Sequence, residues 1–83
     1  MTLADYEKLI KWEESGENSD SYYFLLTDTL HHCTYNVVLI KDTNDIMVNG
    51  DKIDNIPRNI RQLIVPRIEY FLAVKRNRNK AGR

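Results

Sequence analysis

A stripe of apolar residues at helical spacing in the last third of this 83-residue chain most constrains its fold. The residues recur every three or four positions: Ile60, Leu63, Ile64, Ile68, Phe71 and Leu72. Pro57, just before the stripe, suits the first turn of a helix, where no amide hydrogen is needed. Pro66 lies inside the stripe, where it removes a hydrogen bond and costs about 3 kcal/mol unless the helix kinks. Since the apolar register continues past Pro66, we predict one long kinked helix with a single face to bury.

The segment between residues 22 and 53 has the composition and turns of an antiparallel sheet. Aromatic and β-branched residues predict strands at 22–27 and 33–41, and a third strand at 46–48. Asn49-Gly50 is the strongest hairpin dipeptide in the chain and predicts a short return strand at 51–53. The turn signal at 28–31 is weak, so a helix across 22–30 is the main alternative. Both faces of the first strand are apolar, which predicts either a central strand or an interface.

The N-terminal segment predicts a first helix over residues 3–14. Thr2 and Asp5 resemble a capping box, and apolar residues follow at helical spacing. Trp12 lies beside the apolar stripe, where it could close the edge of the core or join an interface. Residues 15–21 contain no apolar side chain and predict a loop.

These elements predict an α+β fold with an N-terminal helix, a three- or four-stranded antiparallel meander and a long Pro-kinked C-terminal helix. Both helices are expected on one face of the sheet, because each has one apolar stripe to bury. Residues 1–76 form a single domain in this prediction. Residues 77–83 are expected to be a basic disordered tail, since their only apolar residue is Ala81.

The formal net charge of zero hides two halves of opposite charge. Residues 1–56 contain four basic and eleven acidic side chains, a net charge of −7. Residues 57–83 contain eight basic side chains and one acidic side chain, a net charge of +7. Such an asymmetry either attracts a charged partner or neutralises itself within the fold or between copies of the chain. The sequence leaves both possibilities open.

The cysteine count and the hydropathy predict a cytoplasmic protein. Cys33 is the single cysteine, so no internal disulfide can form. The residues after Met1 lack the basic stretch and apolar run of a signal peptide. No stretch without a charged residue, 21–27 and 29–40 included, is long enough to cross a bilayer. We therefore expect a protein of a reducing compartment with no membrane partner.

The sequence offers no complete residue set for catalysis or metal binding. His31, His32 and Cys33 have metal-ligand chemistry, but a structural zinc site requires four ligands. Adjacent residues of a strand also point to opposite faces. A Cys–His nucleophile needs a third group to orient the base. We expect no enzyme activity, no cofactor and no metal.

Arginine residues of the predicted long helix are the candidate contacts for a protein partner. Arg58 and Arg61 lie on its polar face. Arg67 falls in the middle of the apolar arc if the helix is unbroken, and arginine is enriched at interface hot spots. Two alternatives stay open for Arg67: the Pro66 kink turns it outward, or its chain snorkels to water.

Five cations in the last nine residues form a second candidate surface, because each phosphate that a cation neutralises releases counterions. The candidate nucleic-acid contacts are Lys75, Arg76, Arg78, Lys80 and Arg83. The alternative is a solvated end that keeps a near-neutral protein soluble.

The leading functional prediction is a small regulatory or inhibitory binding protein that blocks a protein or nucleoprotein partner and forms a homodimer. The alternative is an RNA- or other nucleic-acid-binding protein that uses the basic helix and tail. Asn and Ile occur eight times each and Asp seven times, a bias typical of an AT-rich genome. Compact proteins of this kind are often phage or mobile-element accessory proteins, an association that rests on frequency and not on physics.

Overall fold

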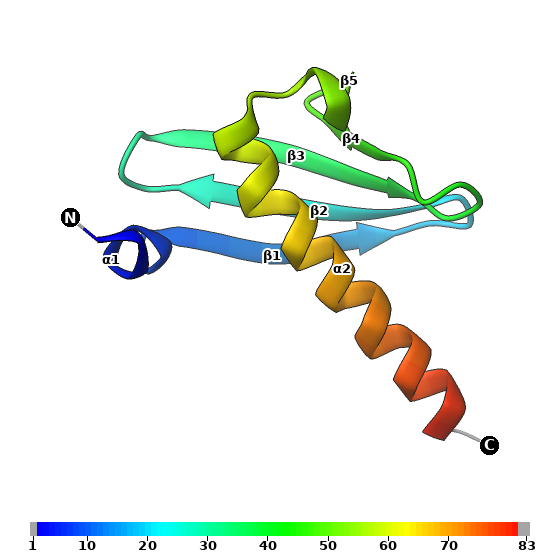
Figure 1. The fold of residues 1–83 in the computed structure, drawn as a ribbon. Helices are drawn as coiled ribbons and strands as arrows, with labels where there is room; N and C mark the ends of the chain where they lie inside the picture. The colour runs from blue at the N-terminus through cyan, green and yellow to red at the C-terminus, as the bar shows by residue number, and fades with distance from the viewer. Residues whose placement is uncertain (1, 82–83) are drawn as a thin grey trace.

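A five-stranded antiparallel meander, crossed on one face by a long helix, forms the body of the molecule in a computed structural model (Figure 1). The structure describes residues 2–81, with the side chains of residues 3, 7 and 78–81 left aside. The strands follow the sheet order β1-β2-β3-β4-β5: β1 (Ile10–Glu17), β2 (Ser21–Asp28), β3 (Cys33–Ile40), β4 (Ile46–Val48) and β5 (Asp51–Lys52). The helices are α1 (Leu3–Glu7), the 3-10 turn η1 (Ile53–Asn55) and α2 (Arg58–Ala81). The coarse α+β prediction is confirmed.

The predicted strands and hairpin of the central segment are present. Asn49 and Gly50 have φ values of 50° and 88°, the left-handed geometry that a two-residue hairpin turn requires. The Asn49 side chain also accepts a hydrogen bond from the amide of Asn36, at 2.8 Å. The return strand is shorter than predicted, because η1 begins at Ile53.

The predicted helix over residues 3–14 is wrong beyond its first turn. The Thr2–Asp5 capping box is present, but α1 ends at Glu7 and β1 begins at Ile10. Pairing with β2 places Trp12 opposite Leu26, and the Trp12 ring stacks on Phe24 at 4.9 Å between centroids. A helix here would leave the edge of β2 without backbone partners, so tertiary pairing overrides the local helical pattern.

The predicted loop over residues 15–21 is also shorter than expected. Residues 15–17 belong to β1, whose register against β2 shifts between Glu14 and Gly16. The shift has the form of a bulge that accommodates Ser15 in the ladder. The turn shrinks to residues 18–20, where the Asn18 side chain accepts hydrogen bonds from the amides of Asp20 and Ser21.

The core lies between α2 and one face of the sheet. Five residues of the predicted stripe are buried, and Leu72 is half-buried at the margin. The sheet supplies the facing side chains, which alternate along each strand: Phe24, Leu26, Val37, Leu39 and Val48. α2 is one helix through Pro66, as predicted, and Pro66 itself is exposed. α1 contributes Tyr6 to the edge of this core, so the cover of the sheet comes from α2.

β2 is a central strand with neighbours on both sides, which explains why both of its faces are apolar. Its second face carries Tyr23 and Leu25, and β3 adds Val38 opposite Tyr23. These side chains are half-buried. Within residues 2–81, this second face has no helix packed on it.

α2 continues past the sheet and past the predicted start of a tail. In Figure 1 the helix crosses β2 and β1 diagonally and its last turns extend beyond the edge of β1. The tail was expected to be disordered from Asn77, but the helix reaches Ala81. Lysine, arginine and alanine have high helical propensity, which favours continuation of the helix through this polar segment. Gly82 and Arg83 lie outside the described residues. Among the described helices, none is long and apolar enough to cross a membrane.

Candidate functional site

α2 exposes two different flanks on either side of its buried stripe. One flank is charged and borders a shallow hollow of about 390 Å³. Its lining consists of Arg58, Arg61, Gln62, Val65, Pro66 and Glu69. The structure therefore brings Arg58 and Arg61, both predicted partner contacts, to one hollow over an apolar floor.

Arg61 is the most distinctive residue of this hollow. Its side chain is half-buried, and its Nε atom is buried without a hydrogen bond to any part of the chain that the structure describes. A buried donor without an acceptor costs about 1–3 kcal/mol, more when the group is charged. Arginine presents Nε and one terminal nitrogen as a fork that fits a carboxylate or phosphate. The Nε is closed to solvent in this conformation, so an acceptor from a partner reaches it only after the Arg61 side chain turns toward the hollow.

Arg67 lies on the other flank, in a groove of about 330 Å³ between α2 and β1. The groove is lined by Trp12, Glu14, Pro66, Arg67, Tyr70, Phe71 and Val74. The Arg67 side chain is half-buried, and its Nη1 donates to the carbonyl of Leu63 at 2.7 Å. The structure therefore separates Arg67 from Arg58 and Arg61, although the groove and the hollow adjoin at Pro66.

Tyr70 was not among the predicted partner contacts, yet it stands out in this groove. Its side chain is 73% exposed, more than the other large hydrophobic residue on the described surface, Leu30, at 40%. Trp12 forms the opposite wall and is held in place by its stack on Phe24. The groove therefore combines Trp, Tyr and Arg, the residue types most enriched in binding hot spots. Sequence spacing alone could have found Tyr70, because it shares an uncharged strip of the predicted helix with Pro66, Ala73 and Asn77.

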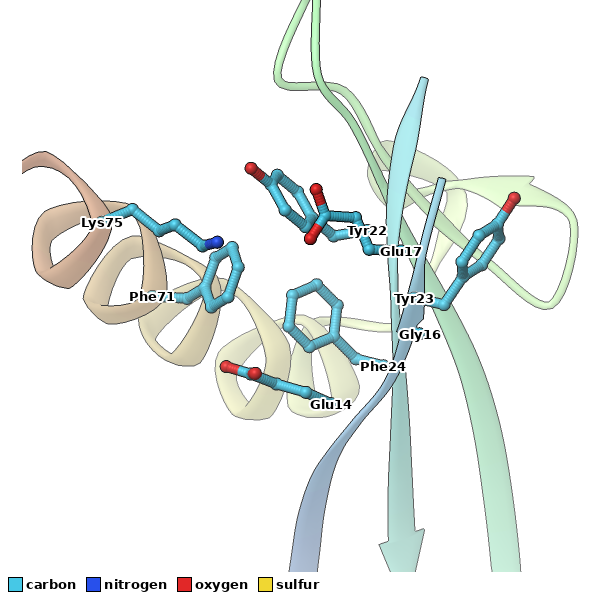
Figure 2. A pocket seen from close by; sticks show the side chains of 8 residues that line it. All are labelled: Glu14, Gly16, Glu17, Tyr22, Tyr23, Phe24, Phe71 and Lys75. Atoms are coloured by element: carbon cyan, nitrogen blue, oxygen red, sulfur yellow. The ribbon is translucent and has the colours of Figure 1, made fainter. Parts of the chain in front are cut away.

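The predicted nucleic-acid contacts divide into different environments. Lys75 turns back to the sheet, with its ammonium 5.0 Å from the Tyr22 ring centroid and 5.4 Å from that of Phe71. Figure 2 shows it reaching from α2 toward these rings, in a hollow of about 210 Å³ that Glu14 and Glu17 also line. Arg76 is exposed. Arg78 and Lys80 lie on the helical backbone of α2, and Arg83 falls outside the described residues.

A second cation closes the same end of the sheet. Lys41 forms an ion pair with Glu17 at 2.7 Å and lies 4.7 Å from the Tyr22 centroid. The hydrogen bond from Lys41 holds the pKa of Glu17 below its ordinary value, and the same bond raises the pKa of Lys41. Lys75 is therefore one of two ammonium groups on Tyr22, which is a structural role in the fold.

The His31–Cys33 segment surrounds a buried carboxylate. Asp28 is 1% exposed and accepts hydrogen bonds from the Tyr6 hydroxyl at 2.6 Å and from the amides of Leu30 and His31. His31 Nδ1 lies 2.7 Å from the same carboxylate. Burial disfavours the ionised form of Asp28, but these hydrogen bonds outweigh it and lower its pKa. The hydrogen bond to Asp28 is the main cause that raises the pKa of Tyr6 to about 12.

This arrangement stabilises the β2–β3 turn. Cys33 Sγ donates to the carbonyl oxygen of His31 at 3.3 Å, so its hydrogen bond is made to the backbone and not to the imidazole. Over residues 2–81, no three His, Cys, Asp or Glu side chains are grouped to hold a metal ion. The chemistry of the segment is thus that of a turn clamp joining α1 to the sheet.

No family model, curated protein or solved structure matches the chain.

Proposed function

We propose that this chain is a small non-enzymatic binding protein that regulates or inhibits a protein or nucleoprotein partner by covering its surface. It is an accessory protein of the phage or mobile-element type in this proposal. The observation that carries the proposal is the unpaired, buried Nε of Arg61 beside Arg58. The partner contributes an acidic segment, and its carboxylate draws the Arg61 side chain outward and accepts the hydrogen bonds that the Nε does not make within the chain.

The expected energetics follow from this contact. A hydrogen bond to a charged group contributes about 1.5–3 kcal/mol, and each 1.4 kcal/mol is tenfold in affinity. Arg61→Ala should therefore weaken binding by about 10- to 150-fold. Arg61→Lys keeps the charge but removes the planar fork, so it should recover little of the loss.

The test begins with selection of random displayed peptides on the wild-type protein. Titration calorimetry then compares the selected peptides on wild-type, Arg58→Ala, Arg61→Ala and Arg61→Lys proteins. Lys52→Ala is the control, because it removes an exposed cation of β5 that does not line the hollow. We expect acidic peptides whose affinity falls with each Arg58 or Arg61 change and not with Lys52→Ala. Selected peptides without acidic residues, or with equal affinity for Arg61→Ala, would refute the proposal.

Nucleic-acid binding is the second candidate, and the extension of α2 beyond the sheet favours it. The last turns carry the basic run on a helix that can lie against a phosphate backbone. Its test is a truncation after Lys75, which keeps the Lys75–Tyr22 contact and removes Arg76, Arg78, Lys80 and Arg83. Loss of four phosphate contacts should reduce the slope of log K against log salt by about 3. RNA affinity with an unchanged salt slope would exclude this surface.

A further inference from the structure

β1 is an edge strand that carries a cation, Lys11, and an anion, Glu13, on either side of Trp12. In the part of the chain that the structure describes, β1 pairs with β2 on one side, and its other edge has no strand. An unpaired edge is a template for another strand. Lys11, Trp12 and Glu13 follow one another on this edge, a cation, an aromatic ring and an anion.

An antiparallel copy of the same strand satisfies these three residues at once. When Trp12 lies opposite Trp12 of the second copy, each Lys11 falls opposite a Glu13, and the ion pair occurs twice. Cross-strand pairs of opposite charge stabilise a sheet and like charges destabilise it. Such a strand pair has the two-fold symmetry of the commonest oligomers, in which the same patch serves both copies.

The neighbouring flank of α2 suits the same symmetry. Pro66, Tyr70, Ala73 and Asn77 follow the i, i+4, i+7, i+11 spacing of one helix face, and all four are exposed. This face borders the groove through Pro66 and Tyr70. These four residues carry no charge, and the two charged residues that line the adjoining groove, Arg67 and Glu14, are of opposite sign. The exposed Tyr70 and the groove beside Trp12 would be buried between two such copies.

A stable dimer needs contacts from α2 as well as from the edge of β1. A stable interface buries about 800 Å² on each partner, which is more than one short strand edge supplies. α2 extends about 15 Å beyond residue 71, at 1.5 Å per residue over its last ten residues. α2 crosses the strands diagonally, so only part of this length runs across them, but a second β1 lies just one strand spacing of about 5 Å away, and the basic end of α2 can reach over it. The opposite charges of the two halves of the chain match this placement.

We infer that the groove and the edge of β1 are occupied by a second copy of this chain, in a two-fold dimer with a continuous sheet through β1 and antiparallel α2 helices. Arg58 and Arg61 lie on the other flank and stay exposed in the dimer. The inference therefore goes beyond the proposed function and does not depend on it.

The test is a charge exchange measured by sedimentation equilibrium. The wild-type protein should have a mass twice the 9.8 kDa of the chain. Lys11→Glu and Glu13→Lys each place like charges opposite one another at two symmetric positions, and each should weaken the dimer about tenfold or more. The double variant, Lys11→Glu with Glu13→Lys, restores both pairs and should return the dissociation constant to within a few-fold of wild type. Lys52→Glu and Asp51→Lys, on the other edge strand, are the matched controls and should leave the dimer unchanged.

Circular dichroism of every variant confirms that the fold is retained. A wild-type monomer at all concentrations would overturn the inference. So would a dimer that the single exchanges leave intact, since it would use another surface, such as the second face of the sheet. Failure of the double variant to recover, with its fold intact, would overturn the Trp12-centred register.

Discussion

Removal of the Tyr6 hydroxyl should destabilise the fold by about 2 kcal/mol, because it deletes one hydrogen bond to a buried carboxylate. The bond joins Tyr6 Oη to Asp28 at 2.6 Å and ties α1 to the end of β2. Tyr6→Phe keeps the ring, so the loss comes from the hydrogen bond and not from packing. For a domain of this size, 2 kcal/mol corresponds to a fall of about 8–16 °C in Tm.

The same bond predicts a dependence on alkaline pH. The pKa of Tyr6 is about 12 in the folded protein, above its ordinary value of 10.0. A raised folded pKa contributes stability that is complete below the unfolded pKa and is lost as pH rises through the folded pKa. Wild-type stability should therefore decline between about pH 10 and 12, and this part of the decline should be absent in Tyr6→Phe.

Urea denaturation, followed by circular dichroism at pH 7 and at pH 11, measures both the loss of stability in Tyr6→Phe and its dependence on pH. Thr34→Val is the control, because it removes a hydroxyl from an exposed strand residue and should change stability by less than about 0.5 kcal/mol. A double-mutant cycle with Asp28→Asn separates the Tyr6–Asp28 interaction from the other bonds of Asp28. Equal stability of Tyr6→Phe and wild type at pH 7 would refute the claim that the Tyr6–Asp28 hydrogen bond stabilises the fold.

Two further predictions concern the sheet and its core. The lowered pKa of Asp28 contributes stability that is present above its unfolded pKa and is lost as pH falls through the folded value, so urea midpoints should drop below about pH 4. Asp28→Asn should flatten that acid decline, and an unchanged acid profile would contradict it. Ile64 is fully buried between α2 and the sheet, so Ile64→Ala should cost about 2–5 kcal/mol in chemical denaturation. A cost below 1 kcal/mol, or one no larger than that of exposed Ala73→Ser, would show that α2 is not packed as described.

The elements with a strong local signal were predictable from the sequence. The stripe from Ile60 to Phe71 identified α2 and its buried face. A helix that buries one face needs apolar residues about every 3.6 positions, whichever element it packs against. Asn49-Gly50 identified its hairpin, because the left-handed turn has few other solutions. The two apolar faces of β2 pointed to its central position, one of two alternatives that the sequence left open.

The first strand was not predictable in the same way. The spacing of Tyr6, Leu9 and Ile10 fits a helix, while Ile10 and Trp12 also fit one face of a strand. The choice depends on the edge of β2, which offers backbone partners only once the meander has formed. The end of α2 was missed for the opposite reason, because helical propensity extends the helix beyond Asn77 where no apolar stripe signals it.

The candidate site was predictable residue by residue but not as a surface. Arg58, Arg61 and Arg67 were singled out as contacts, yet the helix separates the first two from the third. Lys75 was placed with the nucleic-acid contacts, and its position over Tyr22 depends on how α2 crosses the sheet. The Tyr6–Asp28 bond joins residues 22 positions apart, so no local pattern could reveal it.

Purification of the protein from its native host tests the central claim most directly, with mass by light scattering and nucleic acid by the absorbance ratio, at low and high salt. The account predicts a stoichiometric protein companion that is present with wild-type and Lys52→Ala chains and lost when Arg58 and Arg61 are both changed to Glu. A chain that emerges without a protein companion, or with nucleic acid alone that leaves at high salt, would contradict it.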